Sequence, residues 1–134
     1  MSRRRVVVTG LGIVSPVGNN IKTAWENILA GNSGIGPVTR FDVADFPVRF
    51  AGEIRDFDVS EYIPGKDARR MGAFIHYGIA AACQAIADSG IEITAANASS
   101  AGVAIGSGIG GLHGIENTFQ TYLQSGPRKI SPFF

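Results

Sequence analysis

Two short apolar runs, each followed by a glycine-rich turn, limit the folds that this 134-residue chain can adopt. Residues 6–8 lead into a turn at residues 9–12, and residues 100–105 lead into the turn GSGIGG at residues 106–111. A run that is apolar throughout, rather than alternating, is typical of a strand covered on both faces of its sheet. We therefore expect two core strands in a layered α/β fold with a mainly parallel sheet.

Apolar residues at helical spacing predict three helices around these strands. The first covers residues 21–29, with Asn19 or Asn20 as its cap, and the second covers about residues 67–89. A glycine that can end the helix follows each of them. The small side chains of the second helix favour a buried central position. The third covers residues 112–124.

The segment between the first two predicted helices, the charge and the cysteine content limit the possible domain organisation and function. Residues 32–64 are irregular, and we expect a partly ordered excursion with one short strand around residues 48–54. Charged residues make up 17%, against about 25% in an average soluble domain, so part of the surface is expected to be covered by a partner or by further chain. The net charge of +1 favours neither nucleic acid nor a membrane as a partner. A single cysteine fits a reducing, cytoplasmic compartment.

The glycine turns also suggest a dinucleotide site, because residues 106–111 fit the pattern G-x-G-x-x-G. Such a site needs an acid about 20 residues further on for the ribose hydroxyls. Glu116 is the last acid of the chain, and no acid lies between residues 30 and 41 after the first turn. Simple turn chemistry is therefore favoured over phosphate binding, and an oxidoreductase domain is a distant third hypothesis.

Five segments at consistent spacing resemble the amino-terminal part of the β-ketoacyl-acyl carrier protein synthases, of the synthase II type. They are RRVVVTGLGIVSPVGNN at 4–20, WENILAGNSGI at 25–35, FAGEI at 50–54, AIGSGIGG at 104–111 and GPRKISPFF at 126–134. The resemblance runs from the first predicted strand to the last residue. It covers roughly the first third of such an enzyme.

This resemblance implies a thiolase-like fold and a homodimer. Residues 1–134 would be an incomplete amino-terminal part of the synthase N-terminal domain, forming most of the first α/β half of a five-layered α-β-α-β-α sandwich. The implied reaction is decarboxylative condensation of malonyl-acyl carrier protein with an acyl-enzyme thioester, without a cofactor. The family's catalytic cysteine and two histidines would lie beyond Phe134, so the segment alone should be inactive.

Lys66, Arg69 and Arg70 fall on one face of a helix if it begins just before Lys66. Cations at a helix N-terminus oppose the macrodipole by roughly 0.3 to 1 kcal/mol each, so we expect another interaction to favour them. The resemblance implies that they dock the acidic helix of acyl carrier protein. The alternative is a solvated helix start beside Asp67.

The resemblance also implies an acyl tunnel at Gly108, Ile109 and Phe134. Ile109 would line and gate this tunnel, while Phe134 would reach it from the other subunit. The glycines beside Ile109 would let the backbone approach an acyl chain. The alternative is that these apolar residues are ordinary core.

The other reactive side chains are expected to be structural or to lie on the surface. Cys83, in a helix among alanines, is predicted to be core packing. His76 and His113 lack the arrangement of a base beside a nucleophile, and no spacing supports a metal site. A non-catalytic module that binds carrier protein through its basic residues stays open as the alternative function.

Overall fold

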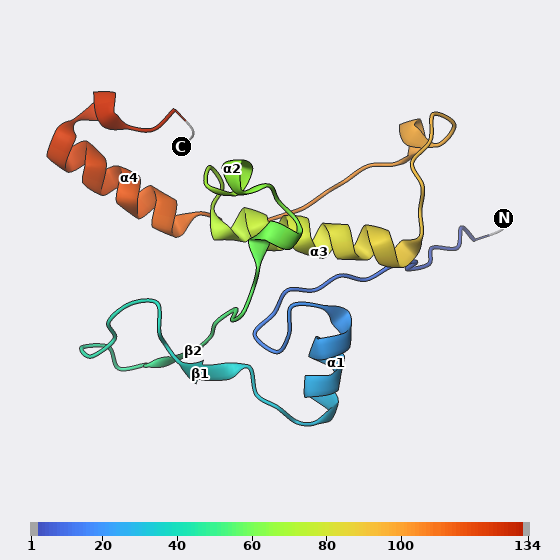
Figure 1. The fold of residues 1–134 in the computed structure, drawn as a ribbon, viewed down its shortest axis with the longest axis horizontal. Helices are drawn as coiled ribbons and strands as arrows, with labels where there is room; N and C mark the ends of the chain where they lie inside the picture. The colour runs from blue at the N-terminus through green and yellow to red at the C-terminus, as the bar shows by residue number, and fades with distance from the viewer. Residues whose placement is uncertain (1–2, 133–134) are drawn as a thin grey trace.

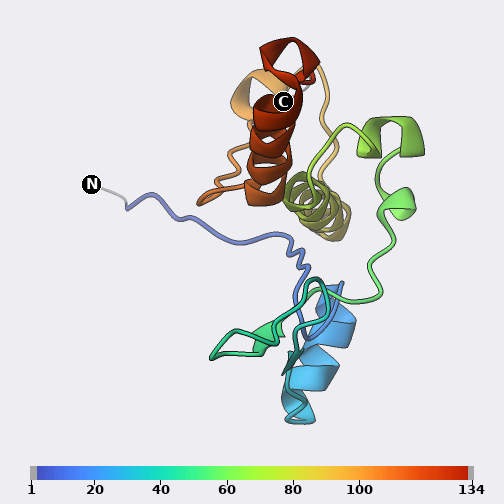
Figure 2. The ribbon, with the colours of Figure 1, turned by 90° about the vertical axis from the view of Figure 1, so that its left-hand side faces the viewer.

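The computed structural model describes residues 3–132, and its longest helix lies at the centre of an open arrangement (Figure 1). The segment from residue 3 to residue 14 passes between α3 and α1 in both views (Figure 2). The α-helices and strands are α1 (Ile21–Leu29), β1 (Ile35–Pro37), β2 (Phe50–Gly52), α2 (Gly65–Ala68), α3 (Ala73–Ser89) and α4 (Leu112–Ser125). Three 3₁₀ helices, η1 (Val59–Glu61), η2 (Ala98–Ser100) and η3 (Pro127–Lys129), complete the elements.

The ends of the helices follow local signals in the sequence. The side chain of Asn20 accepts a hydrogen bond of 2.9 Å from the backbone N–H of Thr23, which makes Asn20 the cap of α1. Gly31 after α1 and Gly90 after α3 have φ angles of +70° and +62°, a conformation that glycine adopts without strain. The predictions of α1 and α4 are confirmed.

The second predicted helix is divided in two, so its prediction as one continuous helix is wrong. Gly72 has extended backbone, with φ −72° and ψ 155°, and separates α2 from α3. The apolar spacing continues across this break, which is why the pattern predicts one helix. The ring of Phe74 lies against Gly72, where an added Cβ would be 3.0 Å from the ring atom Cε1.

The paired strands also differ from the prediction. β1 pairs antiparallel with β2, with Ile35 opposite Gly52 and Pro37 opposite Phe50. β2 lies within the predicted strand at residues 48–54, whereas β1 contains glycine and proline and was not predicted. Within residues 3–132 this pair is the one sheet, so the mainly parallel sheet is not formed by these residues.

The core strands predicted at residues 6–8 and 100–105 are not strands in the described part of the chain. Val6 and Val103 are 88% and 78% exposed, and no described segment forms a strand ladder with either run. A strand needs a hydrogen-bonded neighbour, which a local apolar pattern does not supply. After the run at residues 6–8, the backbone N–H groups of Leu11 and Ile13 donate to the side chains of Asp88 and Gln84, at 2.9 and 3.1 Å, and not to a neighbouring strand.

The first glycine turn packs directly on α3. A Cβ on Gly10 would lie 2.6 Å from the backbone nitrogen of Ser89, and one on Gly12 would lie 2.9 Å from that of Ala85. Only glycine allows the two backbones to approach this closely. The turn thus serves packing against a helix.

Few apolar side chains are buried among the described residues. The buried hydrophobic residues are Ala24, Ile63, Ala68 and Ala80. Cys83 is exposed, so the prediction that it packs in the core is wrong. The reason is that its face of α3 has no covering element among residues 3–132, and Ala80 is the one buried residue of that helix. None of the described helices combines the length and apolarity needed to cross a membrane.

Gln84 of α3 connects three separate segments through one side chain. Its Oε1 accepts from the N–H of Ile13, and its Nε2 donates to the carbonyl of Asn19 at 2.7 Å and to the Tyr62 hydroxyl at 3.0 Å.

Replacing Gln84 by Met in the complete protein should cost about 1 to 3 kcal/mol of stability, because partly buried polar groups lose their partners. Amide hydrogen exchange at Ile13 should accelerate. The exposed Gln120→Met is the matched control, and equal effects of both changes would contradict this role.

The carboxylate of Glu53 joins β2 to the chain that follows β1. It is 8% exposed and accepts hydrogen bonds from the Thr39 hydroxyl at 2.7 Å, the Thr39 N–H at 3.1 Å and the Arg40 N–H at 3.3 Å. These bonds, above all that from the Thr39 hydroxyl, lower the pKa of Glu53. The Arg40 guanidinium in turn donates to the Tyr77 hydroxyl of α3 at 3.0 Å.

Glu53 should therefore make stability depend on pH in the acid range. A carboxyl group whose folded pKa is depressed contributes stability above its unfolded pKa, about 4.3, and loses it as the pH falls through the folded value. In the complete protein, the difference in unfolding free energy between wild type and Glu53→Gln should have its largest value at pH 7 and should decrease below about pH 4. A difference that stays constant down to pH 3 would contradict this role.

Candidate functional site

The three basic residues predicted to act together share one exposed helical turn. Lys66 lies in α2, Arg69 caps its C-terminus and Arg70 follows, and all three are exposed. The N–H of Arg69 donates to Gly65 O at 3.4 Å, and that of Arg70 donates to Asp67 O at 3.0 Å, so the turn continues past α2. α2 begins just before Lys66, as a shared face requires. Their role in docking remains a prediction.

A histidine connects this turn to α3, and two side chains beside the turn are buried. The Nε2 atom of His76 lies 2.9 Å from the carbonyl oxygen of Ala68, the C-terminal residue of α2. Ala68 is 8% exposed and the neighbouring Ile63 is 4% exposed. His76 therefore has a structural role, as predicted. His113 is exposed, with its Nε2 atom 3.0 Å from Asn117 Nδ2.

The glycine loop at residues 106–111 presents Ile109 at its outer side. Ile109 is 75% exposed, and a Cβ added to Gly108 would meet nothing within 4 Å. Gly110 has a φ of +75°, where a residue with a side chain would be strained. Phe134 lies outside the described residues. The tunnel formed by Gly108, Ile109 and Phe134 therefore stays a prediction.

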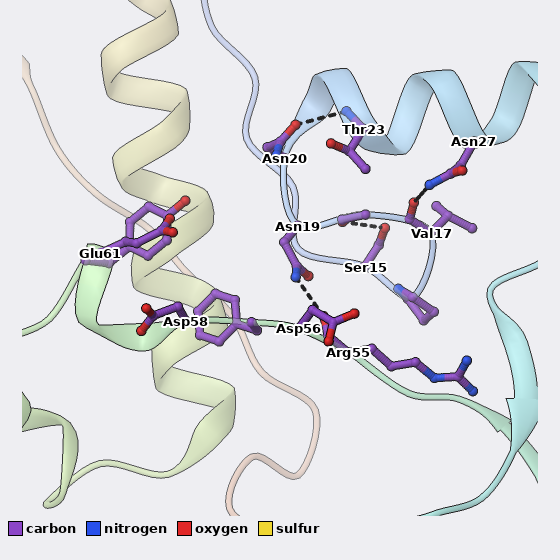
Figure 3. Close-up of a pocket in the computed structure, with 14 residues that line it drawn as sticks. Ser15, Val17, Asn19, Asn20, Thr23, Asn27, Arg55, Asp56, Asp58 and Glu61 are labelled. Atoms are coloured by element: carbon purple, nitrogen blue, oxygen red, sulfur yellow. Dashed lines mark hydrogen bonds between the residues drawn. The ribbon is translucent and has the colours of Figure 1, made fainter.

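The structure also contains a cavity that was not predicted. It has a volume of about 380 Å³ and lies between residues 15–20, the first turns of α1 and residues 55–62 (Figure 3). None of the predicted site residues lines it. Its walls are Ser15, Pro16, Val17, Gly18, Asn19, Asn20, Thr23, Asn27, Arg55, Asp56, Phe57, Asp58, Glu61 and Tyr62.

Asparagine side chains hold the wall segments of this cavity together (Figure 3). The Nδ2 group of Asn19 donates to the carbonyl of Arg55 at 2.7 Å, and that of Asn27 donates to the carbonyl of Val17 at 2.7 Å. The Oδ1 atom of Asn19 is buried without a hydrogen-bond partner. These amides close the turn before α1 against the segment after β2, so their visible role is structural.

Among the residues that the structure describes, the acids of the cavity do not form a metal-binding group. Asp58 accepts hydrogen bonds from the hydroxyl and the N–H of Ser60, at 2.6 and 2.8 Å, and the hydroxyl bond is the larger cause of its lowered pKa. No cysteine or histidine lines the cavity, and the described residues contain no cluster that could hold a metal ion. The sequence shows these acids only as scattered residues, since no spacing connects them with residues 15–27.

Comparison with known proteins identifies relatives along the whole chain. The family profile described as "Beta-ketoacyl synthase, N-terminal domain" matches residues 3–134. The chain is 57% identical to 3-oxoacyl-[acyl-carrier-protein] synthase 2 of Vibrio harveyi and 52% identical to that of Coxiella burnetii, over 134 residues in each case. Each match covers this chain completely but only 32% of the relative's length.

Solved structures of similar fold include ketosynthases. The ishigamide ketosynthase/chain length factor superposes with a TM-score of 0.76 at 30% identity, over 98% of this chain and 33% of that one. A type II PKS ketosynthase, bound to a hexaketide and in complex with its acyl-carrier protein, gives a TM-score of 0.75 at 25% identity. That match covers 98% of this chain and 34% of the other.

Proposed function

Because this chain belongs to the β-ketoacyl synthase family, we propose that it is the amino-terminal part of a 3-oxoacyl-acyl carrier protein synthase of fatty-acid synthesis. Its fold is the thiolase-like fold of the ketosynthases. The observation that carries the proposal is 57% identity along the whole chain to a synthase 2. The chain spans about a third of that relative's length, which supports residues 1–134 as an incomplete N-terminal domain and most of the first half of a five-layered sandwich.

The proposed reaction forms a carbon–carbon bond between two thioesters. A cysteine outside this chain takes the acyl group from its carrier by thioester exchange. Loss of carbon dioxide from malonyl-acyl carrier protein leaves a carbanion, which attacks the acyl carbonyl and expels the cysteine thiolate. Backbone amides stabilise the oxyanion, and two histidines assist decarboxylation. The reaction needs no redox cofactor, because no electrons are gained or lost overall.

Residues 1–134 contribute recognition to this reaction rather than the reacting groups. Lys66, Arg69 and Arg70 dock the acidic surface of acyl carrier protein, supported by their exposure on one turn. Gly108 and Ile109 face the acyl chain, and Phe134 reaches it from the second subunit of a cytoplasmic homodimer. The exposed apolar surface of the described residues supports burial against the rest of such an assembly.

The reading frame beyond codon 134 tests the proposal directly. We expect it to continue into a strand, a turn with a cysteine and a helix, followed later by two histidines. Purified complete protein should then condense acyl and malonyl thioesters. A stop at this codon, together with a stable monomer that binds carrier protein, would favour the non-catalytic binding module.

A further inference from the structure

We propose that Phe74 positions the glycine loop at residues 106–111 and thereby helps to set the acyl chain length that the enzyme prefers. The inference rests on the proposed function, in which Ile109 of this loop faces the acyl chain. Phe74 lies in the first turn of α3, on an element remote in sequence from the loop. It acts through the loop rather than on substrate, so it is a positioning residue.

The ring of Phe74 is in contact with the end of the loop. A Cβ on Gly110 would lie 3.2 Å from its Cε2 atom, and one on Gly111 would lie 3.1 Å from its Cε1 atom. At these distances an added Cβ would require the ring to shift by a few tenths of an ångström, so glycine at both positions lets the loop backbone lie against the ring. Because Gly110 follows Ile109 directly, the ring also limits where Ile109 can lie.

The residue before the loop also lies beside α3. The Cγ2 atom of Ile105 lies 3.7 Å from the position that a Cβ on Gly78 would occupy. Between this place and Phe74, Gly106 and Gly108 have no neighbours within 4 Å of an added Cβ. The loop thus passes between two points on α3, and Ile109 lies beside the point formed by Phe74.

Phe74 is itself held by the elements around it. The ring also lies against Gly72, whose added Cβ would lie 3.0 and 3.1 Å from Cε1 and Cδ1. Gly72 joins α2 to α3, and the contact between His76 and Ala68 fixes α2 on α3. The ring thus lies against glycines of two segments and is 40% exposed. This makes it suited to orient the loop.

A double-mutant cycle in the complete enzyme tests the inference. Gly111 has a φ of −84°, which alanine tolerates, so Gly111→Ala disturbs the loop mainly by pushing against the ring. Phe74→Ala removes that ring. The readout is the ratio of kcat/KM for a long and a short acyl-carrier protein. We expect each change to alter this ratio by about threefold or more, and the Gly111→Ala effect to be largely lost in the Phe74→Ala background, as coupling between contacting residues requires.

Gly114→Ala is the matched control, because a Cβ at Gly114 meets nothing within 4 Å. It should leave the ratio unchanged and combine additively with Phe74→Ala. If Phe74→Ala does not fold, Phe74→Leu replaces it in the cycle. Additive effects of Phe74 and Gly111 changes, or a ratio equal to wild type in both single variants, would overturn the inference. An inactive wild type would instead reject the proposed function.

Discussion

Reversing Lys66, Arg69 and Arg70 to Glu in the complete enzyme should raise the Michaelis constant for acyl-carrier protein by roughly 100-fold at low salt, with kcat little changed. Each exposed ion pair contributes about 0.5 kcal/mol, and a reversed charge adds repulsion of similar size. Three reversals therefore cost roughly 3 kcal/mol, which is about two orders of magnitude in affinity. The constant should be measured for carrier-bound substrate at several salt concentrations, because screening reduces the effect.

The matched control reverses Arg3, Arg4 and Arg5, which are exposed and change the net charge by the same amount. If docking depends on the turn after α2, this control should leave the Michaelis constant nearly unchanged. Equal effects of the two triple variants would mean that the change in net charge, and not the position of the three residues, raises the Michaelis constant. An unchanged constant for the first variant at low salt would reject the docking role.

Residues 1–134 produced alone should neither condense thioesters nor unfold cooperatively. Large apolar side chains lie open on several elements, for example Trp25 at 58%, Phe119 at 56% and Leu123 at 62% exposure. The buried apolar residues of the described part are three alanines and one isoleucine. Such a core does not offset the conformational entropy lost on ordering a chain of this length.

The isolated segment should therefore bind a hydrophobic dye, give weak near-ultraviolet circular dichroism and melt without a sharp transition. The same measurements on the complete protein, where this surface is covered, provide the comparison. A sharp two-state melt of residues 1–134 with no dye binding would contradict the expectation. It would also favour the free-standing binding module.

The features predicted correctly are those that depend on neighbouring residues. The cap of α1 at Asn20 and the ends of α1 and α3 beside Gly31 and Gly90 follow from hydrogen bonds and backbone angles within one turn. Residues 6–8 and 100–105 were predicted wrongly as strands, because a strand exists only with a partner and none of the described segments provides one. A local apolar pattern does not contain that information.

In the candidate site, too, the features that depend on neighbouring residues were predicted and those that depend on distant residues were missed. The shared turn of Lys66, Arg69 and Arg70 follows from residue spacing, and the structure places all three there. The cavity beside α1 depends on contacts such as that between Asn19 and Arg55, 36 positions apart, which no spacing in the sequence indicates. The exposure of Cys83 was missed for a related reason, since small neighbours indicate that a helix can pack closely but not which face is covered.

The most direct measurement of the central claim is the stoichiometry of condensation by the complete protein. Acyl- and malonyl-acyl carrier protein are mixed with the enzyme, and released carbon dioxide and carrier-bound products are quantified together by mass spectrometry. The proposed function predicts equal amounts of carbon dioxide and of a 3-oxoacyl product two carbons longer than the acyl substrate. Binding of carrier protein without either product, by folded protein, would contradict it.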